Sequence, residues 1–139
     1  MREATGNALL TMMVTSIITI IMIFFVGSIS YSKSYRIKNY IINQIEENRG
    51  WNDTLENDIN SYMKEVGYNV RRKKGCPNDN KCGNAINNTD QGSYEYCIYS
   101  CSSGKYYKVL TYMQFEFPVI GNSLKFEVKG ETKSFNDFN

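Results

Sequence analysis

The stretch Ala8–Ile29, ALLTMMVTSIITIIMIFFVGSI, decides how this chain is organised. It has 22 residues and no charged side chain. A helix of that length rises about 33 Å, which is enough to cross the hydrocarbon core of a membrane. We therefore predict a membrane-length helix within residues 1–29. The following residues, 30–139, are enough for one small domain attached to the C-terminal end of that helix.

Charge and cysteine content give opposite indications for the side of the membrane on which this domain lies. Lys33, Arg36 and Lys38 follow the apolar stretch, and such cations favour a cytosolic domain. All four cysteines lie in the domain, which favours two disulfides in an oxidising, extracytoplasmic compartment. We expect the extracytoplasmic location, because whole domains are translocated largely regardless of charge. The alternatives are free thiols in a cytosolic domain, or a secreted domain released by cleavage near Ser30.

The helix is expected to continue well beyond the apolar stretch. Residues 30–48 contain no proline or glycine, and their apolar residues recur every three or four positions. This spacing predicts an amphipathic second half that ends near Asn48. A shorter helix is predicted over residues 54–66, with Asp53 as N-cap, Glu56 completing a capping box and Gly67 ending it.

The remainder of the chain predicts a loop followed by strands. Gly75–Gly92 is rich in Gly, Asn and Asp and has no periodicity, so we expect a long, disulfide-bearing loop. Polar and apolar residues alternate over 94–100, 105–119 and 123–132, with a turn at Gly121-Asn122. This pattern predicts an antiparallel sheet of three to four strands with one buried face, covered by the two helices. The expected fold class is α+β.

Four cysteines allow three disulfide connectivities. Because short loops close at low entropic cost, we expect Cys76–Cys82 and Cys97–Cys101. A zinc site is not favoured, since the spacing lacks close Cys pairs of the usual kind and the chain has no histidine.

Composition argues against several functional classes. The chain has no histidine, which removes the commonest general base and metal ligand. It carries 16 basic and 14 acidic residues, without the basic excess of a nucleic-acid-binding protein. No glycine-rich phosphate loop is present. We therefore expect no enzymatic activity, cofactor, metal, nucleic acid or small-molecule substrate. The basic run Arg71–Lys74 is explained by a solvated edge, or alternatively by attraction to anionic headgroups.

The lead MREATGNALL, which runs directly into the apolar stretch, and the C-terminal segment YYKVLTYMQFEFPVIGNSLKFEVKGET together resemble a known family. The chain resembles type IV pilin-like proteins, most closely the TadE-like pilins or pseudopilins of tight-adherence systems in low-GC Gram-positive bacteria. The resemblance implies a structural subunit that waits in the membrane and then assembles with copies of itself, or with other pilins, into a surface filament.

In that family a glutamate near the mature N-terminus pairs with the terminal amine of a neighbouring subunit. Glu3 is the acidic residue near this end, so the resemblance assigns it to subunit assembly. The family glutamate usually stands fifth after a leader ending in glycine. If Gly6 ended a leader here, the fifth position would be Thr11, which has no charge. The alternative role for Glu3 is an ordinary N-terminal acid interacting with the helix dipole.

The apolar helix also contains residues suited to contact between helices. Thr11, Thr15 and Thr19 are spaced four apart and form a polar stripe, and Gly27 allows close approach. We assign these four residues to subunit assembly. The alternative for the stripe is threonine simply tolerated in a membrane helix.

A second functional hypothesis keeps the membrane helix but not the filament. In it, the chain is a single-pass membrane protein whose extracytoplasmic domain binds a partner or assists pilus assembly. Its mark would be an exposed aromatic patch on the sheet, for which Tyr99, Tyr106 and Tyr112 are the candidates.

Overall fold

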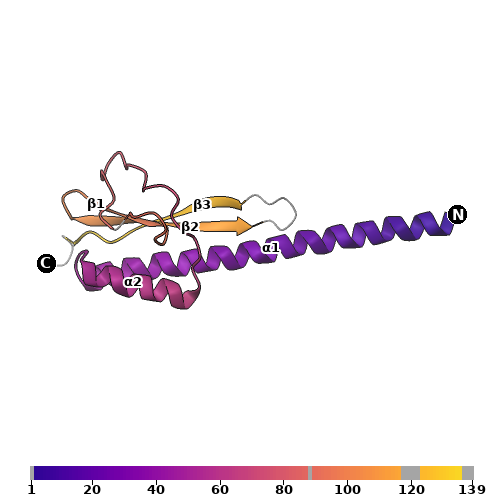
Figure 1. The fold of residues 1–139 in the computed structure, drawn as a ribbon, viewed down its shortest axis with the longest axis horizontal. Coiled ribbons are helices and arrows are strands. Elements are labelled where there is room, and N and C mark those ends of the chain that lie inside the picture. Colours follow the sequence, from indigo (N-terminus) through magenta and orange to yellow (C-terminus); the bar gives the residue numbers. More distant parts are fainter. Residues whose placement is uncertain (1, 88, 117–122, 136–139) are drawn as a thin grey trace.

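A computed structural model describes residues 2–87, 89–116 and 123–135. One helix dominates it: α1, Arg2–Glu47, has 46 residues, which is about 69 Å of helix. Its first half stands free, and the small domain lies along its second half (Figure 1). The predicted long helix is confirmed and ends within a residue of the expected position.

The second half of α1 contributes buried side chains to the hydrophobic core. Ile37, Ile41 and Ile45 lie one turn apart and are fully buried. Ser34, one turn before them, is also buried and donates a hydrogen bond to the Tyr112 carbonyl at 2.9 Å. The amphipathic stripe read from the sequence is therefore the face that packs on the domain.

Helix α2, Asp53–Val66, confirms the predicted second helix with one correction at its start. The N-cap is Asn52, whose side chain accepts a hydrogen bond from the Leu55 amide at 2.7 Å. Asp53 is the first helical residue, so the predicted capping residue was wrong by one position. Gly67 ends the helix at φ 72°, in the left-handed region that glycine adopts without a steric penalty.

The sheet has the order β1-β2-β3 and is antiparallel throughout. Its strands are β1, Tyr96–Cys101; β2, Tyr106–Glu116; and β3, Ser123–Glu131. The three strands agree with the prediction, although the first begins two residues later than expected. Pro118 and the predicted turn at Gly121-Asn122 lie outside the described residues.

The domain has three layers: the helices, the sheet and a long loop (Figure 1). The helices cover one face of the sheet, where the Tyr96 hydroxyl reaches Asn60 of α2. The loop covers the other face, where the Tyr99 hydroxyl donates to the Pro77 carbonyl at 2.6 Å. The prediction of a single buried face was therefore wrong for β1, and also for β2 at Leu110 and Tyr112. Alternation failed as a guide because a loop without secondary structure, invisible to periodicity, buries the second face.

The disulfide pairing also differs from the prediction. The bonds are Cys76–Cys97 and Cys82–Cys101, with Cα–Cα distances of 5.9 and 4.4 Å. Cys97 and Cys101 point to the same face of β1 but are four residues apart, about 13 Å along a strand. They lie too far apart to bond each other. Each instead holds the loop against the sheet.

Candidate functional site

The most unusual surface of the molecule is the first half of α1. The large apolar side chains between Leu9 and Ile29 are exposed, Phe24 by 77%. An 18-residue window of this helix has a mean hydropathy of 2.6, and none of it is buried against the rest of the chain. One helix near the N-terminus is thus long and apolar enough to span a membrane. An exposed apolar surface of this size needs a lipid or protein environment.

The threonine stripe lies on this exposed helix. The hydroxyls of Thr11, Thr15 and Thr19 each donate to the carbonyl four residues earlier, at 2.8 to 2.9 Å. Thr15 is also 3.0 Å from the Met12 carbonyl. The three donors are therefore satisfied inside the helix, and what remains for a neighbour is the hydroxyl oxygen as acceptor and the methyl group.

Glu3 lies in the first turn of α1 and is exposed. About 36 Å of helix separate it from Gly27. The structure therefore places Glu3, the threonine stripe and Gly27 along one rod and does not gather them into a single site.

Gly27 has a partner within the same chain. A Cβ built on Gly27 would lie 2.7 Å from Cε1 of Phe115, a residue of β2. The missing side chain is what lets the β2–β3 hairpin approach α1 at this point. The close approach that the sequence assigned to subunit contact is, in this structure, an approach between the sheet and its own helix.

The hairpin and α1 together form an apolar cleft of about 440 Å³. From the hairpin, Phe115 and Phe126 meet edge-to-face with centroids 5.7 Å apart, and Leu124 lies beside them. From α1 the lining residues are Ile23, Phe24, Gly27, Ser28 and Tyr31. Leu124 and Phe126 remain 49% and 45% exposed.

This surface replaces the aromatic patch expected from the sequence. Tyr99 and Tyr112 are only 1% and 6% exposed, so they form no surface patch, while Tyr106 is half-buried. The loop that covers β1 and β2 removes them from solvent. Alternation over residues 123–132 puts Leu124 and Phe126 on the face that we expect to be buried. Only the length of the hairpin relative to the domain shows that they project beyond its core.

Basic side chains follow directly on the helix. Lys33 and Arg36 line grooves beside α1, one of which also contains Ser30, Asn69 and Gln114. Further along, Lys38 places its ammonium 4.3 Å from the Tyr35 ring centroid, a cation–π contact. The helix surface therefore changes from apolar to basic within about two turns of Gly27.

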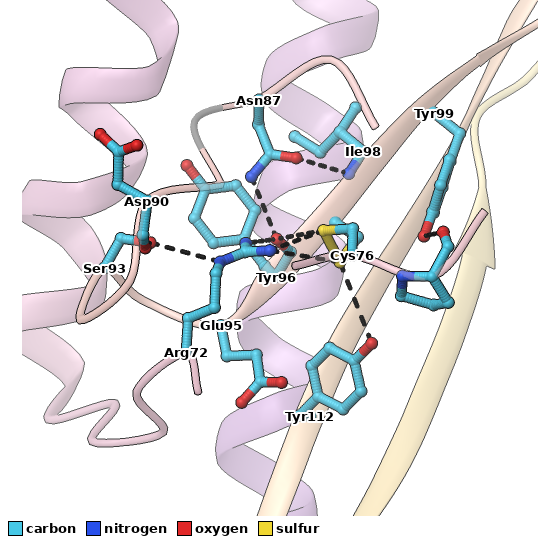
Figure 2. Close-up of a disulfide and its surroundings, with 12 residues drawn as sticks. Arg72, Cys76, Asn87, Asp90, Ser93, Glu95, Tyr96, Ile98, Tyr99 and Tyr112 are labelled. Atoms are coloured by element: carbon cyan, nitrogen blue, oxygen red, sulfur yellow. Dashed lines mark hydrogen bonds between the residues drawn. A yellow bond between two sulfur atoms is a disulfide. The ribbon is translucent and has the colours of Figure 1, made fainter. Parts of the chain in front are cut away.

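Beneath the loop, Arg72 is 2% exposed and anchors the first disulfide (Figure 2). Its guanidinium donates to Cys76 Sγ at 2.7 Å, to Ser93 Oγ at 3.3 Å and to the Tyr96 carbonyl. The predicted solvated edge over residues 71–74 is thus wrong at this position. Asn87 nearby accepts from the Ile98 amide at 3.0 Å, so a side chain completes the edge of β1.

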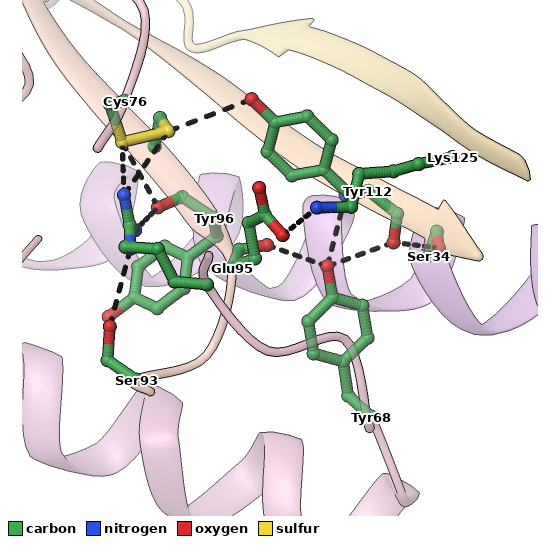
Figure 3. A network of polar contacts seen from close by, with 10 residues as sticks. Ser34, Tyr68, Cys76, Ser93, Glu95, Tyr96, Tyr112 and Lys125 are labelled. Carbon is green, nitrogen blue, oxygen red and sulfur yellow. Dashed lines mark hydrogen bonds and ion pairs between the residues drawn. A yellow bond between two sulfur atoms is a disulfide. The ribbon is translucent and has the colours of Figure 1, made fainter. Parts of the chain in front are cut away.

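A second buried network surrounds the hydroxyl of Tyr68 (Figure 3). This oxygen lies 2.7 Å from the Glu95 carbonyl and 2.9 Å from the Tyr112 carbonyl, and it accepts from the Tyr112 amide at 3.0 Å. Glu95 also forms an ion pair with Lys125. Burial raises the pKa of the Tyr68 hydroxyl well above its ordinary value.

Both buried networks consist of polar groups that satisfy one another's hydrogen bonds. Within the described part of the chain, every buried side-chain nitrogen and oxygen has a hydrogen-bond partner. Among those same residues, no group of three or more His, Cys, Asp or Glu side chains could hold a metal ion. Satisfied donors and acceptors of this kind fix the loop on the sheet.

Comparisons with models of known protein families, with curated proteins and with solved structures give no match.

Proposed function

We propose that this chain is a structural, pilin-like subunit of a type IV or Tad-like surface filament. The observation that carries the proposal is the free first half of α1, whose apolar stretch has no charged side chain and continues without a break into the helix at the core of an α+β domain. In the membrane, lipid would cover this half. In a filament, the same surface would pack against copies of itself or against other pilins.

The proposal places the domain outside the cytoplasm. Its support is the pair of disulfides, which persist in oxidising compartments and are rare in the cytosol. The disulfides hold a long loop that has little secondary structure of its own, so a reducing compartment would weaken the domain. The proposal includes no catalysis, cofactor, nucleic acid or small-molecule substrate, because the chain has no histidine and its net charge is only +2.

Two observations favour a second candidate, a single-pass membrane protein that does not polymerise. The threonine hydroxyls donate within their own helix, and the Phe115 ring of the same chain fills the space beside Gly27. Features assigned to subunit contact therefore have partners without a second copy. In this candidate the domain binds a partner or assists pilus assembly.

Imaging of filaments sheared from source cells separates the two candidates. If the chain is the repeating subunit and its apolar helices are bundled at the axis, the first candidate holds. Recovery of the chain only as a monomer from detergent-extracted membranes would establish the second. Replacing Thr11, Thr15 and Thr19 together by Ala keeps the helix apolar, so a loss of filaments without a loss of membrane insertion would assign the stripe to assembly. The N-terminal residue, measured by mass spectrometry on the same material, shows whether a leader is removed and whether Glu3 remains in the mature chain.

A further inference from the structure

The β2–β3 hairpin extends along α1 past the point where the helix becomes apolar. Its strands run beside α1 with their connected ends toward the N-terminus of the helix (Figure 1). Phe115 contacts Gly27, and Leu124 and Phe126 lie with it over the cleft that Ile23 and Phe24 also line. The end of the described ladder therefore lies at the level of the exposed apolar helix.

The length of α1 indicates where this level falls in a bilayer. From Ala8 to Gly27 the helix has 20 residues, or about 30 Å, which is the thickness of a hydrocarbon core. When Ala8 lies at one boundary of the core, Gly27 lies at the other. Phe115, which rests on Gly27, then lies at that boundary too.

The chemistry beyond Gly27 fits the headgroup region. Tyr31 and Tyr35 are half-exposed, and their rings stack with centroids 6.1 Å apart. Tyrosine is enriched at membrane interfaces, where its amphipathic ring lies at the level of the headgroups. Lys33 and Arg36 follow in the next turns, where their long side chains can reach lipid phosphates. Apolar, aromatic and basic residues thus succeed one another in the order in which a leaflet passes from acyl chains to headgroups.

We infer that the hairpin surface formed by Phe115, Leu124 and Phe126 is a second membrane contact. It rests among the acyl chains of the outer leaflet, close to the ester groups, beside the point where α1 leaves the bilayer. The domain is then held at two places and sits on the membrane in a fixed orientation. The inference rests on the membrane-inserted state in the proposed function, but not on filament formation.

Lipid is favoured over a second copy of the chain because the cleft is continuous with the membrane-spanning surface. Ile23 and Phe24 line the cleft and also belong to the apolar stretch, so lipid that covers them extends to Phe126. Covering the half-exposed side chains of Leu124 and Phe126 with acyl chains removes further apolar surface from water. This adds to the anchoring by α1 and orients the domain.

Tryptophan quenching by brominated phosphatidylcholine tests the contact. The natural Trp51 lies just before α2 and is removed by W51F, so that F126W carries the single tryptophan. The full chain is placed in nanodiscs at one chain per disc, with bromines close to the ester end of the acyl chains. L124W, at the neighbouring position in the cleft, is a second probe that preserves apolar character.

Three matched probes complete the experiment. F24W in the same W51F background reports insertion of α1 with the same lipids, because Phe24 lies about one helical turn inside the boundary at Gly27. K129W lies on the same strand, on the opposite face of the sheet, and the wild-type Trp51 reports the far end of the domain. We expect strong quenching of F126W and L124W, and little quenching of K129W and of Trp51.

The outcomes separate the inference from the proposed function. If F24W is quenched but F126W and L124W are quenched no more than K129W, the hairpin contact is overturned and the membrane helix stands. Unquenched F24W would overturn both. If F126W is unquenched at one chain per disc but becomes shielded from iodide at two, a second copy covers the surface and the inference is wrong. Quenched F126W without filaments would support the contact while removing the filament.

Discussion

The substitution Tyr68→Phe tests the idea that one hydroxyl completes the sheet just before β1 begins. β1 begins at Tyr96, so β2 extends beyond it and the amide of Tyr112 has no strand residue opposite it on that side. The Tyr68 hydroxyl takes that place, accepting from the Tyr112 amide and lying 2.7 Å from the Glu95 carbonyl (Figure 3). Removing one oxygen atom therefore breaks a ladder-like connection at the centre of the domain.

The expected cost follows from the groups left behind. The Tyr112 amide becomes a buried donor without a partner, which costs about 1–3 kcal/mol. The Glu95 carbonyl loses a hydrogen bond worth about 1 kcal/mol. The Tyr112 carbonyl is spared, because Ser34 still donates to it at 2.9 Å. We expect Y68F to lower the free energy of unfolding by about 2–4 kcal/mol, and Tm by about 10 °C.

The assay is denaturant unfolding of the full chain in detergent micelles, followed by near-ultraviolet circular dichroism and amide hydrogen exchange. The half-exposed Tyr31 supplies the control, since Y31F should change stability by less than about 0.5 kcal/mol. A stability loss below that value in Y68F, with unchanged protection of the Tyr112 amide, would refute the reasoning.

The same variant has a distinct alkaline behaviour. Burial raises the pKa of the Tyr68 hydroxyl, so the folded form keeps its proton at a pH where the unfolded chain has lost it. That stabilisation is complete below the ordinary tyrosine pKa and is lost as pH rises above it. Y68F should therefore lose stability less steeply than the wild type above about pH 10.

Three further predictions concern the rest of the domain. Gly130→Val should destabilise by about 1–3 kcal/mol in the same unfolding assay, because its Cβ would lie 2.8 Å from side chains of α1, whereas exposed Lys129→Val should not. Asp79 of the loop forms an ion pair with Lys108 of β2, and the hydrogen bond from Lys108 lowers the Asp79 pKa. The pair therefore stabilises the domain above the ordinary aspartate pKa, and this contribution is lost as pH falls through the lowered value. The Asp79 side chain also accepts from the amides of Lys81 and Cys82, so D79N should remove the acid dependence yet keep these amides protected, whereas D79A should expose them to exchange. Replacing Cys82 and Cys101 by Ser should cost about 3 kcal/mol, and peptide mapping of the intact protein should recover these two cysteines linked.

Local sequence was sufficient for the elements themselves. The uncharged run and the spacing of Ile37, Ile41 and Ile45 specify one long helix whose second half packs, because both are read over consecutive turns. Period-two alternation likewise located the strands. The shift of the N-cap from Asp53 to Asn52 is the size of error that adjacent capping residues produce, since both side chains can accept the same amides.

The disulfides and the site could not be obtained in this way. Loop-closure entropy favoured the short pairings, but a strand holds Cys97 and Cys101 about 13 Å apart, so geometry excluded what entropy preferred. Arg72 belongs to a basic run whose composition is typical of a solvated edge. Only the tertiary structure shows that the loop buries it, with a hydroxyl, a sulfur and a carbonyl as acceptors.

The sequence alone determined that a 22-residue uncharged stretch must lie in lipid or against protein, because its composition permits no other environment. The tertiary structure decided what accompanies it. It placed Phe115 on Gly27 and left Leu124 and Phe126 half-exposed beside the helix. The physical reason is that strand alternation sets only the face on which a side chain lies. Whether that face is covered depends on how far the hairpin extends past the elements that pack on it.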